Sequence, residues 1–176
     1  MIDSLKKSEQ HQHSNGGGWV ADTAIVDKTA YVGPNAQVYG NAWVSGDARV
    51  YGYARVSGGA RVSGYAWVYG NAQVSGNARV SGGAQVYGNA QMYGNAWVSG
   101  DAQVFDGFWV TPPLYIQGTK HSITNCDYGK IAIGCEIHTF AEWKKNYKTI
   151  GKNAGYTAEQ IKEYGRHIAY VVKMGR

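Results

Sequence analysis

Residues 44–62 read VSGDARVYGYARVSGGARV, a stretch in which the unit Ala-x-Val-x-Gly-x recurs without a gap. Outward from this stretch, an aliphatic residue occupies every sixth position from Val20 to Val110, and Met92 alone is not valine. Alanine precedes these positions by two residues, and glycine follows them by two, through most of that range. An uninterrupted period of this kind indicates a repeat architecture, in which each unit packs on its neighbours.

Each unit has room for one short strand and one corner. Alanine and valine are two residues apart, so both side chains point to one face of the strand and the residues between them point outward. Glycine recurs without a miss from Gly40 to Gly100 and provides a corner where positive φ is tolerated. Coils that stack in parallel bury the valine column without any helix. We therefore predict an all-β solenoid whose inward column runs to Val110.

The composition excludes collagen and disordered linkers, two common classes of glycine-rich chain. Of the 176 residues 25 are glycine and only 3 are proline, and glycine does not recur at every third position, so the chain is not collagen-like. An apolar fraction of 44% with only 16% charged residues argues against disorder. No apolar run approaches the ~20 residues that span a bilayer. Residues 1–18 lack the apolar core of a signal peptide, so we expect a cytoplasmic protein with no membrane contact.

The repeats quoted above resemble the bacterial transferase hexapeptide repeat, in which three hexapeptides form one triangular coil of a left-handed parallel β-helix. One detail differs, because many members carry the glycine one residue after the aliphatic position and this chain carries it two residues after. The resemblance implies a left-handed β-helix over residues 19–118, preceded by a flexible segment of residues 1–18. Such proteins are commonly homotrimers, so it also implies a homo-oligomer, with a trimer favoured.

Two further segments resemble hexapeptide-repeat proteins encoded by bacteriophages and prophages. Residues 131–147 read IAIGCEIHTFAEWKKNY and residues 155–164 read GYTAEQIKEY, which is similar to the C-terminal part of those proteins. Residues 16–38, GGGWVADTAIVDKTAYVGPNAQV, look like their first coils. Most of them have no assigned activity. The resemblance implies a phage protein in the cytosol of a bacterial host.

In coils of about eighteen residues, outward side chains eighteen positions apart stack at roughly 4.8 Å. One resulting column is aromatic: Tyr51, Tyr69, Tyr87 and Phe105, beside Arg49, Trp67, Gln85 and Gln103. Stacking of like aromatic rings can simply stabilise the sheet. An exposed apolar patch also commonly meets a partner. We expect this column, with Trp67, to form the oligomer interface.

A second column contains Ser45, Ser63, Ser81 and Ser99, beside Trp43, Arg61, Arg79 and Trp97. Two arginines between two tryptophans can hold an anion or a planar group. The alternative is a solvated face on which tryptophan shields the arginine stems. The third column is mixed: Tyr39, Ser57, Ser75 and Tyr93, beside Arg55, Gln73, Gln91 and Trp109. We predict ligand or partner binding by Trp43, Arg61, Arg79, Trp97 and Arg55.

Residues 119–176 are expected to form a C-terminal cap with short strands and two helices. The period ends at Thr111-Pro112-Pro113, and short strands follow up to Ile137. Thr139 with Glu142 and Thr157 with Gln160 have capping-box spacing, which predicts helices to about Tyr147 and to about Met174. We expect the apolar stripe of the second helix to cover the open end of the coils. The stripe comprises Ile161, Tyr164, Ile168, Val171 and Val172.

The net charge of +5 belongs to the cap, because residues 111–176 hold ten basic and five acidic side chains and the rest of the chain is balanced. Lys144, Lys145, Lys148 and Lys152 form a basic cap patch. A contact with nucleic acid is conceivable there but is not favoured over a solvated helix face. Cys126 and Cys135 are too few for a disulfide scaffold, so free thiols are expected.

Catalysis is weakly indicated. Hexapeptide-repeat acyltransferases use a histidine base beside the coils, and no histidine lies between His13 and His121. We expect no cofactor and no metal, and if the protein is an enzyme its base is His138 or His121. The first hypothesis is a non-enzymatic oligomeric binding protein that blocks or sequesters a host defence protein or a nucleotide-like anion. The alternatives are an acyl- or acetyltransferase using an acyl-CoA donor along the coils, and a structural or virion-associated spacer.

Overall fold

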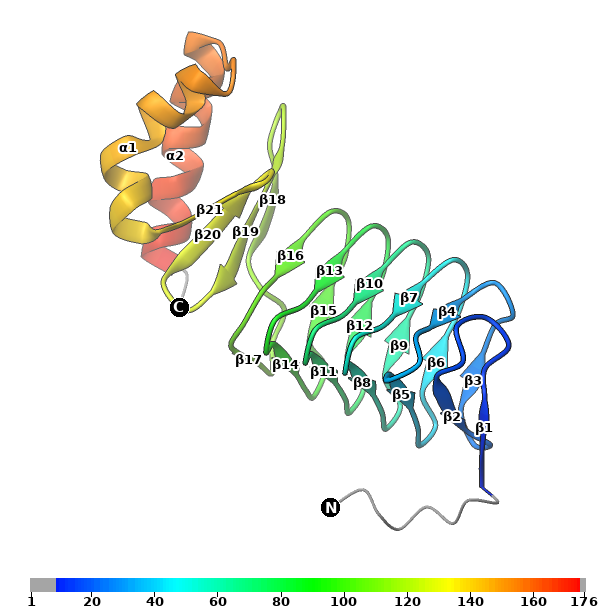
Figure 1. Cartoon of the computed structure of the whole chain (residues 1–176). Helices are drawn as coiled ribbons and strands as arrows, with labels where there is room; N and C mark the ends of the chain where they lie inside the picture. The colour runs from blue at the N-terminus through cyan, green and yellow to red at the C-terminus, as the bar shows by residue number, and fades with distance from the viewer. Residues whose placement is uncertain (1–8, 175–176) are drawn as a thin grey trace. The chain divides into compact units, whose positions relative to one another are not determined.

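The computed structural model describes residues 9–174, which form a parallel β-solenoid and a unit of four strands and two helices (Figure 1). One compact unit comprises the residues up to Asp101 and Phe105–Pro112. The other comprises Ala102–Val104 and the residues from Pro113 onward. This architecture confirms the predicted all-β solenoid followed by short strands and two C-terminal helices. The left-handed coiling stays a prediction.

Three sheets run along the coils, and nearly all of their strands have two residues. The first contains, in spatial order, β1 (Gln10–Gln12), β2 (Trp19–Ala21), β5 (Gln37–Val38), β8 (Arg55–Val56), β11 (Gln73–Val74), β14 (Gln91–Met92) and β17 (Phe108–Trp109). The second contains β4 (Tyr31–Val32), β7 (Arg49–Val50), β10 (Trp67–Val68), β13 (Gln85–Val86) and β16 (Gln103–Val104). The third contains β3 (Ile25–Val26), β6 (Trp43–Val44), β9 (Arg61–Val62), β12 (Arg79–Val80) and β15 (Trp97–Val98).

Neighbouring coils pair at a spacing of eighteen residues, as predicted: Arg49 is the register partner of Trp67, and Val50 of Val68. Every alanine and aliphatic residue of the repeat from Ala30 to Val104 is at most 1% exposed. Burying each valine contributes about 1.5–3 kcal/mol relative to leaving it exposed. The repeat therefore places one continuous apolar column inside the coil and leaves the variable positions outside.

The corner glycines are required for two reasons, which Gly52 illustrates. Its φ is 67°, in the left-handed region that side chains other than glycine rarely adopt. A Cβ at this position would also lie 2.9 Å from both the backbone nitrogen and the backbone oxygen of Gly70 on the next coil. The glycine of each corner thus permits both the turn and the close stacking of coils.

The last coil differs from the prediction for Val110 and Trp109. Trp109 pairs with Met92 and is only 7% exposed, whereas Val110 is 44% exposed. The corner at Asp106 and Gly107 has one residue fewer than the others, and a shift of one residue exchanges the two faces of a strand. Phe108 therefore continues the outward column, and the indole of Trp109 closes the inward column while its Nε1 donates to the carbonyl of Asp106 at 2.6 Å.

Residues 9–18, part of the N-terminal segment that we expect to be flexible, contain a short strand and a buried histidine. Strand β1 pairs antiparallel with β2, with Gln10 opposite Ala21. His13 is 7% exposed, and its Nε2 lies 3.0 Å from the carbonyl oxygen of Ala30. Strand β1 therefore pairs with β2, which would otherwise be the open edge of the first sheet. Residues 1–8 of the predicted flexible segment lie outside the described residues.

The second unit has an antiparallel sheet in the order β18 (Tyr115–Gln117), β19 (Ser122–Asp127), β20 (Lys130–Ile133) and β21 (Glu136–Thr139). Helices α1 (Phe140–Asn153) and α2 (Ala158–Met174) follow it (Figure 1). Both capping boxes form as predicted, since Glu142 N and Gln160 N donate to the hydroxyls of Thr139 and Thr157 at 3.2 Å. Within residues 9–174, no helix is both long and apolar enough to cross a membrane.

The stripe of α2 is buried in its own unit, which corrects our expectation that it covers the open end of the coils. Tyr164, Ile168 and Val171 share a core with Ile123, Ile131 and Trp143. Helix α1 is also longer than predicted, since it continues past Tyr147 to Asn153. The added turns contain the buried Gly151, where α2 approaches so closely that a Cβ would lie 3.1 Å from the Ile161 side chain.

We predict that Gly52→Ala lowers the free energy of unfolding by about 1–3 kcal/mol, because the new side chain meets both a strained φ and the backbone of Gly70. Denaturant unfolding followed by circular dichroism measures the change. The matched control is Gly59→Ala, because its φ is not positive and its Cβ would meet the side-chain oxygen of Asn77 at 3.0 Å and no backbone atom closer than 3.5 Å. Equal destabilisation by the two substitutions would contradict this account of the corner.

Candidate functional site

The first candidate surface is a column of stacked rings on the second sheet, Tyr51, Tyr69, Tyr87 and Phe105, which we call the tyrosine ladder. The Tyr51 and Tyr69 rings are parallel within 1° at a centroid distance of 5.0 Å, and those of Tyr69 and Tyr87 are parallel within 3° at 4.9 Å. Phe105 is tilted by 57° against Tyr87 at 5.3 Å. These rings form the column that the repeat spacing predicts. Its role as an oligomer interface stays a prediction.

The ring stack is partly withdrawn from water. Burial, together with the neighbouring Tyr87 and Tyr51 hydroxyls, raises the pKa of Tyr69 to about 12. Trp67 meets both Tyr51 and Tyr69 edge-on at 6.3 and 6.4 Å, and the guanidinium carbon of Arg49 lies 5.5 Å from the Trp67 ring centroid. The ladder is therefore a column of partly buried aromatic rings with the Arg49 guanidinium on Trp67 beside it. Aromatic residues are enriched at interfaces between proteins.

The second candidate surface lies on the third sheet and comprises Trp43, Arg61, Arg79 and Trp97, which we call the arginine ladder. Trp43 is the register partner of Arg61, Arg61 of Arg79, and Arg79 of Trp97. Both tryptophans are exposed, by 43% and 53%. The guanidinium carbon of Arg61 lies 5.6 Å from the Trp43 ring centroid. The structure thus brings together all four residues that the sequence placed in this column.

The charges of the arginine ladder are not compensated within the described part of the chain. Arg61 and Arg79 are both exposed, and no carboxylate of residues 9–174 forms a salt bridge with either. The small side chain of Ser81 accepts a hydrogen bond from Trp97 Nε1 at 3.3 Å and leaves the surface beside the arginines open. Arg55, the fifth predicted ligand residue, lies apart from this ladder, because it pairs with Gln37 and Gln73 on the first sheet.

A groove of about 570 Å³ on the first unit combines residues that the sequence pattern did not single out as a site. Its lining contains Arg49 with its two register partners, Tyr31 and Trp67, and the corner residues Asp47 and Tyr65. A signal exists in the sequence, since Tyr31, Arg49 and Trp67 recur at the eighteen-residue spacing. In the sequence analysis, the column that contains Arg49 and Trp67 predicted only an oligomer interface. The corner residues Asp47 and Tyr65 do not belong to that column, so the pattern did not connect them with Arg49.

The two histidines named as candidate bases occupy different places in the second unit. His138 Nε2 lies 2.9 Å from Glu136 Oε2, and the His138 ring meets Trp143 edge-on at 5.0 Å. His121 lines a cavity, where its ring centroid lies 5.9 Å from that of Tyr156. Within residues 9–174, no group of three or more His, Cys, Asp or Glu side chains has metal-binding geometry.

The basic cap patch is exposed on α1. Lys144, Lys145, Lys148 and Lys152 are all exposed, and none forms a salt bridge within residues 9–174. The ammonium of Lys148 lies 5.9 Å from the Tyr147 ring centroid. Both cysteines are free, with Cys126 buried and Cys135 exposed. Burial raises the pKa of Cys126 to about 11, so its thiol is protonated near neutral pH.

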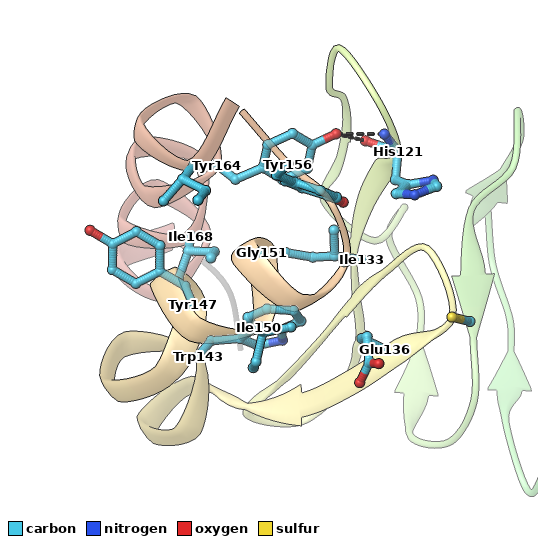
Figure 2. A pocket seen from close by; sticks show the side chains of 13 residues that line it. His121, Ile133, Glu136, Trp143, Tyr147, Ile150, Gly151, Tyr156, Tyr164 and Ile168 are labelled. Atoms are coloured by element: carbon cyan, nitrogen blue, oxygen red, sulfur yellow. Dashed lines mark hydrogen bonds between the residues drawn. The ribbon is translucent and has the colours of Figure 1, made fainter. Parts of the chain in front are cut away.

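A cavity of about 80 Å³ lies among β20, β21, α1 and α2, and Figure 2 shows its lining side chains. Its inner wall is apolar, with Ile133, Trp143, Ile150, Ile161 and Ile168. His121, Cys135, Glu136 and Tyr156 provide its polar groups. Sequence reasoning missed this cavity because its walls come from five segments between residues 121 and 168 that no local pattern connects.

Comparison with protein families finds the same repeat. The family model described as the YdcK beta solenoid repeat matches residues 36–52, 44–58, 54–70, 72–88 and 84–100. The chain is a β-solenoid repeat protein. All these matches lie in the coils of the solenoid, which carry both ladders and the groove. The family model therefore describes the repeat and matches no part of the four-stranded sheet or the two helices. No curated protein and no solved structure matches the chain.

We predict that Tyr69→Lys lowers the oligomeric state, because an ammonium at the centre of the tyrosine ladder would lose water on association. Sedimentation velocity should detect a smaller species than the wild-type assembly. Tyr53→Lys is the control, since Tyr53 is 67% exposed at a corner and lies outside the ladder. The interface assignment would be wrong if the wild type sediments as a single chain, or if Tyr69→Lys retains the wild-type assembly.

Proposed function

We propose that this protein is a non-enzymatic oligomeric binding protein that holds an anionic partner on the arginine ladder. One observation carries the proposal: Arg61 and Arg79 are register partners on adjacent strands, and no described carboxylate pairs with either. Like charges directly opposite each other destabilise a sheet pair. An anion that bridges the two guanidiniums would remove this repulsion, so the ladder gains stability when a partner is bound.

The surroundings of the two arginines suit a partner that is both planar and anionic. Guanidinium groups bind carboxylates and phosphates through paired hydrogen bonds. Trp43 and Trp97 lie three strand spacings apart, about 14 Å, and their exposed rings can stack on a base or another planar group. Two classes of partner meet this description, namely a nucleotide-like ligand and an acidic surface of a protein.

The biological setting that we propose rests on the sequence resemblance. The repeats resemble the bacterial transferase hexapeptide repeat, and residues 131–147 resemble the C-terminal part of phage-encoded proteins with that repeat. On this basis we propose a phage-encoded protein, in the cytosol of a bacterial host, that sequesters or blocks a host component such as a defence protein. A trimer formed through the tyrosine ladder would present three copies of the arginine ladder to such a target.

We predict that the double substitution Arg61→Gln with Arg79→Gln weakens anion binding at least tenfold, since each charge-assisted hydrogen bond contributes about 1.5–3 kcal/mol. Calorimetric titration with linear and cyclic nucleotides and with an oligoglutamate peptide measures the change. A pull-down from infected host lysate, followed by mass spectrometry, compares the natural partners that the wild type and the double variant retain.

A matched double variant, Arg166→Gln with Lys173→Gln, removes two exposed positive charges of α2 and should bind like the wild type. This control separates the ladder from the net charge of the chain. The proposal would be wrong if the wild type binds none of the anionic probes, or if the ladder variant retains wild-type affinity for the probe that binds.

One observation favours the acyl- or acetyltransferase as a second candidate. Glu136 Oε2 lies 2.9 Å from His138 Nε2, and a carboxylate in that position can orient an imidazole that removes a proton from an acceptor. A shallow pocket of about 270 Å³ adjoins the pair and is lined by Glu136, His138, Ile150, Asn153 and Ala154. An acceptor hydroxyl or amine bound there would meet the imidazole.

If this second candidate is correct, His138→Ala lowers the turnover of acetyl-CoA by about 10²–10⁴-fold, the range of a positioned general base. Release of the coenzyme A thiol, measured with amine and hydroxyl acceptors, follows the reaction. His167→Ala provides the control, because His167 has its own carboxylate partner, Glu163, at 3.4 Å and does not line the pocket. Absence of turnover in the wild type, or unchanged turnover in His138→Ala, would eliminate the transferase.

A further inference from the structure

The inner walls of the cavity in the second unit have few polar groups that could form hydrogen bonds with water. Trp143 Nε1 donates to the carbonyl of Ile131 at 2.8 Å, so the indole nitrogen is not available to a ligand. The Tyr164 hydroxyl donates to the carbonyl of His121 at 2.6 Å and accepts from the backbone nitrogen of the same residue (Figure 2). It also accepts from the backbone nitrogen of Lys120. With these polar atoms engaged, the remaining inner surface is formed by isoleucine side chains and aromatic rings. A space of this kind favours an apolar occupant over water.

The charged groups beside the cavity are also engaged. Glu136 pairs with His138, and the ammonium of Lys120 donates to the carbonyls of Ala154 and Gly155 at 2.8 and 3.1 Å while it lies 4.6 Å from the Tyr156 ring centroid. A charged ligand would therefore find no free counter-charge among these groups, and desolvating it would be costly. The Tyr156 hydroxyl stays neutral too, because burial and the adjacent Tyr164 raise its pKa to about 12.

The size of the cavity limits the occupant. Its volume of about 80 Å³ is well below the roughly 150 Å³ of an engineered cavity that admits benzene. It is therefore too small for a whole ligand of benzene size, and it admits only a branched end of a few carbons while the rest of the ligand lies in the opening. His121, Cys135 and Glu136 are exposed residues of the lining and mark its polar opening, where a hydroxyl of the ligand would meet water and protein donors.

We propose that this cavity is a binding site for a small uncharged ligand whose branched aliphatic end lies among Trp143, Ile150 and Ile161 and whose polar end faces His121 and Cys135. The site is independent of the arginine ladder, because every residue that lines it belongs to the second unit. It makes the second unit a small-molecule sensor or carrier. An anionic partner on the coils is not needed for this role.

Isoamyl alcohol is the probe that tests the proposal, and the indole N–H resonance of Trp143 in two-dimensional NMR is the readout. We expect a saturable shift with a Kd on the order of 1 mM, a realistic affinity for about six non-hydrogen atoms. The indole resonances of Trp43 and Trp97, which point outward from the coils, should not move. Isovalerate and isoamylammonium have the same apolar end with a charge, and should bind at least tenfold more weakly.

Reaction of Cys135 with an aromatic disulfide reagent gives a second measurement. Cys126 is buried and has a raised pKa, so the native chain should react at Cys135, beside the opening of the cavity. Saturating isoamyl alcohol should slow this reaction, whereas isovalerate at the same concentration should not.

Ala154→Leu fills the cavity from its exposed rim and should weaken binding of isoamyl alcohol at least tenfold. Ala141→Leu introduces the same side chain at an exposed position of α1 outside the lining and should leave binding unchanged. If Ala154→Leu does not fold, Ile161→Phe blocks the cavity from α2. The proposal would be overturned by an unmoved Trp143 resonance in the wild type, by equal binding of the charged analogues, or by a folded blocking variant that binds like the wild type.

Discussion

Every coil of the solenoid depends on the backbone ladder that joins it to the coil eighteen residues later, and that ladder depends on the corner. Each regular corner from Gly40 to Gly100 has a glycine with φ between 59° and 70°. From Gly40 to Gly82, a Cβ on this glycine would lie within 3.3 Å of the backbone of the glycine eighteen residues later. The hydrogen bonds of the ladder form only if the coils are this close. A strict six-residue period is therefore a consequence of backbone geometry. The buried alanines and valines follow the same period because every coil encloses an interior of the same width.

The same constraint decides what the protein can present to other molecules. Residues eighteen apart must lie side by side, whether or not their side chains attract each other. In the tyrosine ladder this placement produces parallel rings at about 5 Å, which stabilise the sheet. In the arginine ladder it brings Arg61 beside Arg79, which repel. No described carboxylate forms a salt bridge with either arginine, and this observation is the basis of the anionic partner that we propose.

The second unit follows a different principle, because its core is assembled from an antiparallel sheet and two helices with no repeat. Side chains from β19, β20, α1 and α2 meet there, and Gly151 and Gly165 permit close packing at positions where a Cβ would meet Ile161 or the Tyr147 ring. The cavity lined by Trp143 and Ile150 adjoins one of these close contacts, because Gly151 and Ile161 also belong to its lining.

The sequence by itself determined the coil, its three outward columns and the starts of both helices, because each of these depends on residues at a short and regular spacing. The sequence pattern misplaced Trp109 and Val110. The corner at Gly107 is one residue shorter than the others, which exchanges the inward-facing and outward-facing positions of the following strand, and the six-residue period does not predict this shortening. Tertiary structure alone decided the partner of the α2 stripe, the pairing of Glu136 with His138, the groove over Arg49 and the cavity of the second unit. An apolar stripe predicts that a helix face is buried, but it does not predict the surface against which that face packs. A cavity is the space that remains after all the side chains around it have packed, so no local pattern predicts it.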